Sequence, residues 1–430
     1  MLDEKIKTKK ARLAIVGLGY VGLPLAVEFA GAGFAVYGID VDNEKVKFLN
    51  KGKSYIEDIP DFLLRPFIAN KKFISTTDFS ILKSQDVVVV CVPTPLRKSK
   101  DPDISYILSS ITEVARYLHK DQLVILESTT YPGTTQEIVL PLLAKKGLRV
   151  GTDFNLAFSP ERVDPGNKKY KIRNTPKVVG GITKRCTQLA QKLYMQIVDT
   201  VIPVSSTQAA EMVKLLENTF RAVNIGLVNE VALMCDKLRL DTFEIIEAAS
   251  TKPFGFLPFY PGPGIGGHCI PLDIHYLSWK LKTLNFFSRF IELAGEINSH
   301  MPEYVVSKIQ AILNDFKKPI RNSKILVLGV AYKKDVSDTR ESPALDVISI
   351  LLNKKASLSY SDPYVKRICI GNKSLCSVKI TPTLLASQDC VVIATNHSSF
   401  DYKNIIKYSR IIFDSKNATK GFSSSKIIKL

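Results

Sequence analysis

Short apolar runs alternate with helix-forming stretches along roughly the first 200 residues of the chain. The apolar runs occupy 13–16, 35–39, 87–92, 123–127, 155–158 and 177–179, and each has the length of a buried parallel strand. Turn residues and amphipathic segments separate them, which is the βαβ rhythm of a doubly wound sheet. The pattern therefore predicts an α/β domain built on a parallel sheet.

The pattern changes near Ser206. From there to about Leu240, apolar residues recur close to every 3.6 positions, at 212, 215, 216, 220, 223, 227, 231 and 234, which predicts one long helix. Such a length is typical of a helix that spans two domains or forms a dimer interface. A loop rich in proline and glycine follows at 253–273, and further helix is expected to about Phe316.

A second α/β rhythm begins at 324–329, with further strands expected at 356–361, 389–394 and 409–414. It lacks the Gly-x-Gly-x-x-Gly pattern of a dinucleotide site. The fold class predicted for the chain is thus α/β, with two Rossmann-like doubly wound domains joined by a long central helix. The expected domains are a dinucleotide-binding domain at 1–205, a central helical domain with the glycine-rich loop at 206–316, and a C-terminal α/β domain at 317–430.

Composition and charge narrow the expected partners. Fifty-nine Lys and Arg against 41 Asp and Glu give a net charge of +18, which attracts anions. No nucleic-acid-binding motif is apparent, so we expect small anionic ligands and no nucleic acid. No run approaches the roughly 18 apolar residues of a membrane span, and the seven cysteines are scattered without CxxC spacing. We therefore expect a cytoplasmic protein with reduced thiols, no membrane association and no metal site.

A glycine fingerprint follows the first predicted strand and opens a predicted helix. In this context the backbone amides and the helix N-terminus hold a pyrophosphate. Asp40 ends the next predicted strand, where a carboxylate would accept hydrogen bonds from the adenosine ribose and repel a 2′-phosphate. The pattern predicts NAD as the cofactor, although Lys45 weakens the preference over NADP slightly, and a glycine turn without a ligand is the alternative. The fingerprint residues are Gly17, Leu18, Gly19, Tyr20, Val21 and Gly22.

Two later loops follow predicted strands at the same edge of the sheet, Val92-Pro-Thr-Pro95 and Glu127-Ser-Thr-Thr130. Their hydroxyls are candidates for contacts with the dinucleotide, or they are ordinary turn residues. The hydroxyl-bearing residues are Thr94, Ser128, Thr129 and Thr130.

One thiol, Cys269, stands in the glycine-rich loop. Glycines at 262, 264, 266 and 267 would let a substrate approach and leave backbone amides available to an oxyanion. A thiol beside a nicotinamide is what an enzyme needs to oxidise an aldehyde to an acid through a thioester. The alternatives are a buried structural cysteine and a Cys–His hydrolase using His268, which would leave the dinucleotide fingerprint unexplained.

Three polar side chains elsewhere are candidates for acid–base chemistry. Lys214 and Asn218 are four residues apart on the predicted long helix, so they project from one face. They could steady an oxyanion and orient a hydroxyl, or they could form a solvated face. Glu161, in the segment 158–167, follows a predicted strand and could activate water or be a turn carboxylate.

Together these segments resemble the UDP-glucose/GDP-mannose dehydrogenase family. The resemblance covers nearly the whole chain and implies an N-terminal NAD domain, a central helical dimerisation domain and a C-terminal UDP-sugar domain. It implies a homodimer through the central helix and an NAD-dependent, four-electron oxidation of a sugar C6 alcohol to a uronate. The segments that carry it are 17–24, 127–129, 159–162, 211–218, 264–273 and 333–342.

The resemblance also implies roles for individual residues. Cys269 would form the thiohemiacetal and thioester, and Asp273 and Lys214 would supply acid–base or charge-stabilising groups. Asn218 would support the oxyanion, while Glu161 and Thr129 would handle water and proton transfer. Arg340 would reach the cofactor. The implied substrate-binding residues are Glu161, Arg162, Lys214, Asn218, Phe259, Tyr260, Gly266 and Lys333.

Segments 159–167 and 251–262 look like the bacterial branch of this family that acts on UDP-N-acetylglucosamine. The predicted product is UDP-N-acetylglucosaminuronate, a precursor for O-antigen or capsule polysaccharide. UDP-glucose, UDP-N-acetylmannosamine and UDP-N-acetylgalactosamine are the alternative substrates. Two other functions are alternatives. One is a two-electron β-hydroxyacid dehydrogenase, which would need neither the thiol nor the second α/β domain. The other is a non-catalytic basic protein, which would bind nucleic acid with a steep salt dependence.

Overall fold

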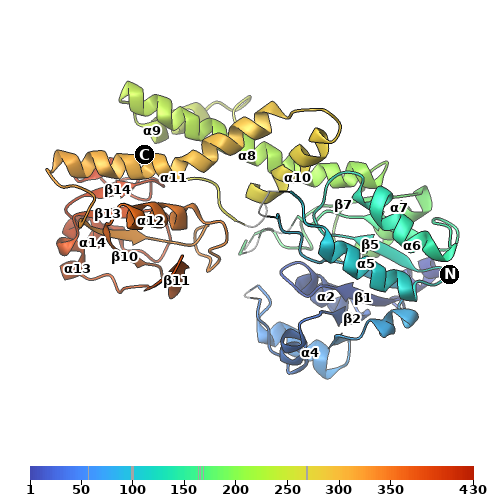
Figure 1. The fold of residues 1–430 in the computed structure, drawn as a ribbon. Coiled ribbons are helices and arrows are strands. Elements are labelled where there is room, and N and C mark those ends of the chain that lie inside the picture. Colours follow the sequence, from blue (N-terminus) through green and yellow to red (C-terminus); the bar gives the residue numbers. More distant parts are fainter. Residues whose placement is uncertain (57, 98–100, 163, 165, 168, 268–269) are drawn as a thin grey trace. The chain divides into compact units, whose positions relative to one another are not determined.

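The computed structural model of the chain describes residues 1–430 apart from 57, 98–100, 163, 165, 168 and 268–269 (Figure 1). The fold divides into two compact units. Unit 1 comprises residues 1–217 with 275–286, and unit 2 comprises 218–274 with 287–430. The divisions fall inside two helices, α8 (Thr207–Leu238) and α10 (Ile270–Lys282).

Unit 1 is built on an eight-stranded sheet of order β3-β2-β1-β4-β5-β6-β7-β8. Among the described residues its neighbouring strands are parallel except for β6 and β7, which are antiparallel. The strands are β1 (Arg12–Val16), β2 (Ala35–Ile39), β3 (Phe73–Thr76), β4 (Val87–Val90), β5 (Leu123–Leu126), β6 (Asn155–Phe158), β7 (Lys177–Gly181) and β8 (Val201–Pro203).

The six strands expected from apolar runs in this unit are confirmed, and the two that were missed, β3 and β8, are the edges of the sheet. A central parallel strand is covered on both faces and reads as a continuous apolar run, whereas an edge strand is not. The side chains of β3 alternate between buried and half-buried positions, and β8 ends in Pro203 with mostly exposed residues. An edge strand tolerates proline because the missing N–H is not needed for the ladder.

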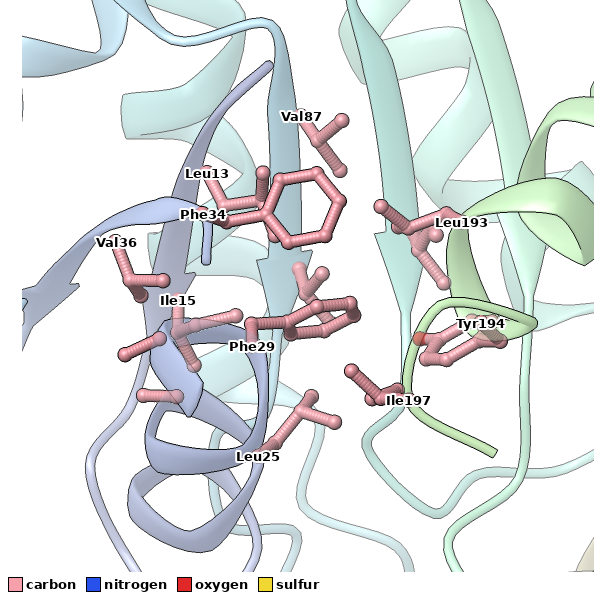
Figure 2. Close-up of a cluster of buried hydrophobic side chains, with 14 of the residues drawn as sticks. Leu13, Ile15, Leu25, Phe29, Phe34, Val36, Val87, Leu193, Tyr194 and Ile197 are labelled. Carbon is pink, nitrogen blue, oxygen red and sulfur yellow. The ribbon is translucent and has the colours of Figure 1, made fainter. Parts of the chain in front are cut away.

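Helices cover both faces of this sheet. Leu13 and Ile15 belong to a core with α2 (Gly22–Gly31) and α7 (Lys184–Tyr194), while Ala14 and Val16 pack on the opposite face with α5 (Ser105–Tyr117). Figure 2 shows the first core, where Phe29 of α2 and Tyr194 of α7 approach the strands. The alternation follows from the two-residue repeat of a strand. The remaining helical segments of this unit are α1 (Leu2–Lys7), α3 (Asn43–Asn50), α4 (Asp61–Ala69), η1 (Phe79–Ser84), η2 (Thr134–Val139), α6 (Leu140–Leu143) and η3 (Ala144–Lys146).

Unit 2 contains a five-stranded parallel sheet of order β10-β9-β13-β14-β15. The strands expected from the sequence are present, and β15, a three-residue edge strand, was not foreseen. An antiparallel hairpin, β11–β12, is also present. The elements are α9 (Thr242–Ser250), α11 (Arg289–Asp315), β9 (Lys324–Leu328), α12 (Pro343–Asn353), β10 (Ser357–Ser361), β11 (Arg367–Ile370), β12 (Lys373–Cys376), α13 (Pro382–Ser387), β13 (Cys390–Ile393), α14 (Tyr402–Tyr408), β14 (Ile412–Asp414) and β15 (Ile427–Lys429).

The two sheets repeat one local design. Each first strand is followed directly by a glycine with positive φ, Gly17 at +91° after β1 and Gly329 at +78° after β9. Each glycine N–H continues the ladder, to the carbonyl of Ile39 at 2.7 Å and of Ser361 at 2.9 Å. Both glycines lie where the strand order reverses, which is the usual ligand position in doubly wound sheets. The predicted fold class, two Rossmann-like domains with the long helix α8, is confirmed.

Among the described residues, no helix has both the length and the apolar character required to cross a bilayer.

Candidate active site

The glycine fingerprint occupies the carboxyl end of β1, and each glycine answers a different steric demand. A Cβ on Gly17 would lie 2.6 Å from the carbonyl oxygen of Cys91, and a Cβ on Gly22 would collide with the carbonyl oxygen of Gly17. Gly19 differs, because a Cβ there would meet no atom within 4 Å. Gly17 and Gly22 therefore serve the packing of β1 and α2, while open space at Gly19 fits the pyrophosphate of a dinucleotide.

Asp40 stands directly after β2, as a ribose-binding carboxylate requires. Its Oδ2 accepts a hydrogen bond from the Leu18 N–H at 2.9 Å, and its Oδ1 accepts one from the Asp42 N–H at 3.0 Å. The ammonium of Lys45 is 4.0 Å from Oδ2. The Leu18 side chain is fully buried, so Leu18 can face a dinucleotide only through its backbone. The residues present thus fit NAD.

The same aspartate position in unit 2 is saturated by the protein itself. Asp362 follows β10 and accepts hydrogen bonds from the N–H groups of four residues and from Nε2 of His397 at 3.0 Å. A carboxylate has about four lone-pair sites, so none is left for a ribose. Asp362 therefore cannot bind a ribose in the way predicted for Asp40. The four backbone donors are Val330, Ala331, Tyr364 and Val365.

The hydroxyls predicted to contact the dinucleotide differ in their surroundings. Ser128 donates to the carbonyl of Val92 at 2.8 Å, and Thr130 shares a 2.6 Å hydrogen bond with Thr134. Both are buried, whereas Thr129 between them is half-buried. Thr94 is buried as well, and its carbonyl accepts a hydrogen bond from the Tyr276 hydroxyl at 2.7 Å. Ser128 and Thr130 thus shape the loops, and Thr129 presents the more accessible hydroxyl.

Glu211, near the start of α8, attaches that helix to the segment after β5. Its carboxylate accepts the N–H groups of Gly133 at 2.6 Å and Thr135 at 2.9 Å, and the Thr135 hydroxyl at 2.6 Å. Burial raises the pKa of Glu211 to about 7, against the lowering effect of these hydrogen bonds. Glu211 opens the segment 211–218 that carries the family resemblance, but the sequence did not predict that it positions this loop.

Unit 1 brings Glu161, Arg162 and Lys214 together. The Lys214 ammonium donates to the backbone carbonyl of Glu161 at 2.8 Å, so it meets the chain and not the carboxylate. The Glu161 carboxylate accepts the Arg162 N–H at 2.7 Å. The Arg162 guanidinium donates to the carbonyl of Pro176 at 2.6 Å and to Glu217 at 2.5 Å. The segment after β6 is therefore held from both sides.

Unit 2 brings together Asn218 and Asp273. The Asn218 amide donates to Asp273 Oδ2 at 2.5 Å, and both side chains are buried. Asp273 lies in the first turn of α10, which begins at Ile270. The predicted nucleophile Cys269 and its neighbour His268 lie outside the described residues.

The glycines before Cys269 serve packing within unit 2. A Cβ on Gly266 or Gly267 would lie 2.8 Å from the Tyr332 side chain, and the Gly267 N–H donates to the carbonyl of Arg340 at 3.2 Å. The Gly262 N–H donates to the side-chain oxygen of Asn229 at 3.0 Å. The sequence had suggested access for a substrate as the reason for these glycines, and the close contact with residues 332–343 is a second reason.

The other residues of unit 2 that were predicted to bind the cofactor or the substrate differ in exposure and in contacts. Arg340 is exposed and forms a bidentate pair with Asp338, at 3.0 and 2.7 Å. Lys333 is half-buried. Phe259 packs edge-on against Phe220 at 5.8 Å between ring centroids. Tyr260 is 49% exposed, which leaves it accessible to a ligand.

Lys416 is a basic residue near the loop that the sequence reasoning missed. It follows β14, and a Cβ on Gly262 would collide with its ammonium. Burial lowers the pKa of Lys416 to about 8, against the attraction of Asp414. A lysine directly after a parallel strand was the available signal, because ligands bind at the carboxyl ends of such strands.

Comparison with known proteins finds one enzyme family that matches the chain along most of its length. Family models of the UDP-glucose/GDP-mannose dehydrogenase family match in order: the NAD binding domain at residues 11–198, the central domain at 208–300 and the UDP binding domain at 326–421. A UDP-N-acetyl-D-mannosamine dehydrogenase of Pyrococcus horikoshii is 38% identical over 95% of this chain and 96% of its own. A UDP-N-acetyl-D-glucosamine 6-dehydrogenase of Pseudomonas aeruginosa is 32% identical over 95% and 97%.

Solved structures agree with the sequence comparison. The structure of the UDP-D-ManNAc dehydrogenase from Pyrococcus horikoshii superimposes with a TM-score of 0.87 at 35% identity, covering 97% of this chain and 98% of that one. The likeness therefore extends over the whole length of both chains.

Proposed function

Because the chain belongs to the UDP-glucose/GDP-mannose dehydrogenase family, we propose that it oxidises the C6 alcohol of a UDP-sugar to a carboxylate in two NAD-dependent steps. The observation that carries the proposal is the ordered match of all three family domains, together with a first-sheet site that fits NAD. The buried Asn218–Asp273 pair supports it, because Asp273 follows Cys269 by only four residues in the sequence and the mechanism requires polar groups beside the nucleophile.

Bound NAD supplies a hydride acceptor for each of the two oxidations. In the first, the sugar C6 alcohol loses a hydride and a proton to give the aldehyde: the Asp273 carboxylate takes the hydroxyl proton, while the Lys214 ammonium and the Asn218 amide stabilise negative charge on the oxygen. The Cys269 thiolate then bonds to C6, and the resulting thiohemiacetal loses a second hydride to become a thioester.

Hydrolysis completes the cycle. Glu161 takes a proton from water, the water oxygen bonds to C6, and the carbon–sulfur bond breaks so that Cys269 leaves as thiolate. The balance is one alcohol, two NAD and one water giving one carboxylate, two NADH and three protons. Thr129 assists proton transfer at this stage.

For the sugar, we propose UDP-N-acetylglucosamine. Support comes from segments 159–167 and 251–262, which resemble that branch, and from the relative of that specificity at 32% identity. A second candidate is UDP-N-acetylmannosamine, its C2 epimer, which the 38% identical relative favours.

Counting NADH tests both parts of this proposal. We expect two NADH, measured at 340 nm, for each molecule of limiting UDP-N-acetylglucosamine, with UDP-N-acetylmannosamine and UDP-glucose turned over poorly. Two NADH from the manno epimer alone would keep the four-electron chemistry and replace the sugar. A single NADH from every sugar would contradict the thioester route.

We propose that the active form is a homodimer formed through the central helix. Phe220, Leu227 and Met234 are seven residues apart on α8 and about half exposed, at 49%, 54% and 50%. Farther along the same helix, Leu233 lines an apolar groove between α8 and α11 that also includes Leu293 and Met301. Exposed apolar stripes of this kind are typical of subunit interfaces.

Leu227→Asp is expected to convert the dimer to a monomer, because two carboxylates would be buried in the symmetric contact. Light scattering after gel filtration should report a mass falling from twice 47.8 kDa to 47.8 kDa. Leu63→Asp, at an exposed leucine of α4, is the matched control and should keep the wild-type mass. An unchanged mass for Leu227→Asp would place the interface elsewhere.

A further inference from the structure

A buried lysine lies between two carboxylates at the carboxyl ends of β5 and β6 in the first sheet. Lys177 opens β7, and its ammonium is 3.2 Å from Oε1 of Glu127 and 3.8 Å from Oε2 of Glu161. The three side chains are 8%, 0% and 12% exposed. Removing an ion from water costs several kcal/mol unless a partner of opposite charge compensates it. The buried Lys177 ammonium and the two carboxylates therefore depend on one another for their stability.

The reversal of β7 creates the cluster. In the antiparallel register, Phe158 lies opposite Gly180, and continuing that register by three residues brings Lys177 opposite Glu161. A hydrogen bond of 2.8 Å from the Ser159 hydroxyl to the carbonyl of Val178 supports the continuation. If β7 ran parallel to β6, Lys177 would lie at the amino ends of the neighbouring strands, far from the carboxyl ends of β5 and β6.

Other groups fix the far side of the lysine. The Tyr194 hydroxyl donates to Oε1 of Glu127, and the Lys177 ammonium lies 4.8 Å from the centroid of the Tyr194 ring. Figure 2 shows Tyr194 among the apolar side chains of the first core, which hold its ring in place. The buried thiol of Cys91 directly follows β4, and burial together with the charges of Glu127 and Glu161 raises its pKa.

The charge balance favours an ionised lysine that serves both carboxylates. Burial alone would lower the pKa of Lys177, but Glu127 and Glu161 outweigh it and raise that pKa. Burial raises the pKa of Glu127 to about 7, against the opposing charge of Lys177. Among the described residues, Oε2 of Glu127 has no hydrogen-bond partner. The Lys177 ammonium therefore contacts both carboxylates, and Glu127 is the nearer of the two.

We propose that Lys177 is a positioning residue for the hydrolytic half of the reaction: anchored by Glu127 and Tyr194, its ammonium holds the Glu161 carboxylate in place. The inference rests on the proposed function, in which Glu161 takes the proton of the attacking water. When Glu161 becomes a neutral acid in that step, the ammonium keeps Glu127 as its partner and is not left unpaired.

Lys177→Met is expected to slow hydrolysis while leaving both hydride transfers. Stopped-flow measurement at 340 nm should show a burst of two NADH per subunit, followed by a steady rate reduced roughly 100-fold, the usual scale of a lost general base. Intact-mass analysis should detect the acyl enzyme. The KM for the sugar and the Kd for NAD should change little, because Lys177 contacts Glu161 and not the ligands in this scheme.

The pH dependence gives a readout that a merely structural role would not move. Without the ammonium, two neighbouring carboxylates are harder to ionise, so the acid limb of the kcat profile should move to higher pH by at least about one unit. Glu127→Gln removes the competing carboxylate and should move the same limb to lower pH. Lys177→Arg, which keeps the charge, should restore the wild-type profile in large part, and Lys192→Met, at an exposed lysine of α7, is the matched control.

The outcomes separate the two proposals. Wild-type enzyme that gives no NADH with any UDP-sugar would overturn the proposed function and this inference with it. Wild-type enzyme that gives two NADH, with a Lys177→Met variant showing no burst and an unmoved acid limb, would overturn the inference alone. If Lys177→Met does not fold, an unmoved acid limb in Glu127→Gln has the same meaning.

Discussion

Replacing Cys269 by serine is expected to abolish net oxidation of the UDP-sugar. A serine hydroxyl is nearly the size of the thiol but is very weakly ionised at neutral pH, so it does not form the adduct with the aldehyde. Without that adduct the second hydride has no thiohemiacetal to leave from. We expect steady-state NADH production to fall by at least about a thousandfold, in line with the loss of other catalytic nucleophiles.

Binding should survive this substitution, because the change exchanges one sulfur atom for oxygen and removes no group that holds the nucleotide. Isothermal titration with the UDP-sugar should give a Kd within about threefold of wild type. Cys376→Ser, at an exposed cysteine of β12, is the control and should keep full turnover. Undiminished turnover in Cys269→Ser would remove the thioester from the mechanism.

Gly22→Ala is expected to have the other large effect, through the fold. The new methyl group would collide with the carbonyl oxygen of Gly17, which is backbone and cannot swing aside. Either the turn after β1 opens or α2 moves away from the sheet. Movement of α2 would disrupt the core, because its residues Leu25 and Phe29 are fully buried there. We expect loss of NAD binding together with a fall in Tm of several degrees, as for other overpacked sites.

Gly19→Ala separates binding from folding. Its methyl group would enter open space in the protein, so the Tm should remain within about one degree of wild type. The same methyl group would stand where the pyrophosphate approaches the backbone, so NAD affinity should fall at least about tenfold. Equal loss of stability in both variants would show that Gly19 also has a packing role. Thermal melts with and without NAD make the comparison.

Sequence patterns anticipated the parts of this protein that depend on neighbours along the chain. Apolar runs identified the inner strands of both sheets, and the 3.6-residue repeat identified α8. The fingerprint and Asp40 are linked by a short βαβ unit, so their meeting at one edge follows from local geometry. Asn218 and Asp273 were both named as candidates, but only the structure shows the 2.5 Å hydrogen bond between their side chains.

Sequence patterns could not predict the contacts that depend on strand direction or on packing between segments far apart in the chain. The apolar run at 177–179 predicted a strand of the parallel sheet, yet β7 runs antiparallel to β6. A period of two residues says nothing about direction, and that direction decides whether Lys177 meets Glu161. The same limit concealed Glu211, whose partners Gly133 and Thr135 are far away in sequence.

The sequence by itself thus determined the α/β fold class, the family resemblance and the NAD site, because each depends on residue types at short and regular spacing. The tertiary structure alone decided which charges share a buried space: Lys177 with Glu127 and Glu161, and Asp362 with His397. Burial makes these pairings energetically decisive, since an ion removed from water needs its partner within a few ångströms. Chain folding over long separations supplies that partner.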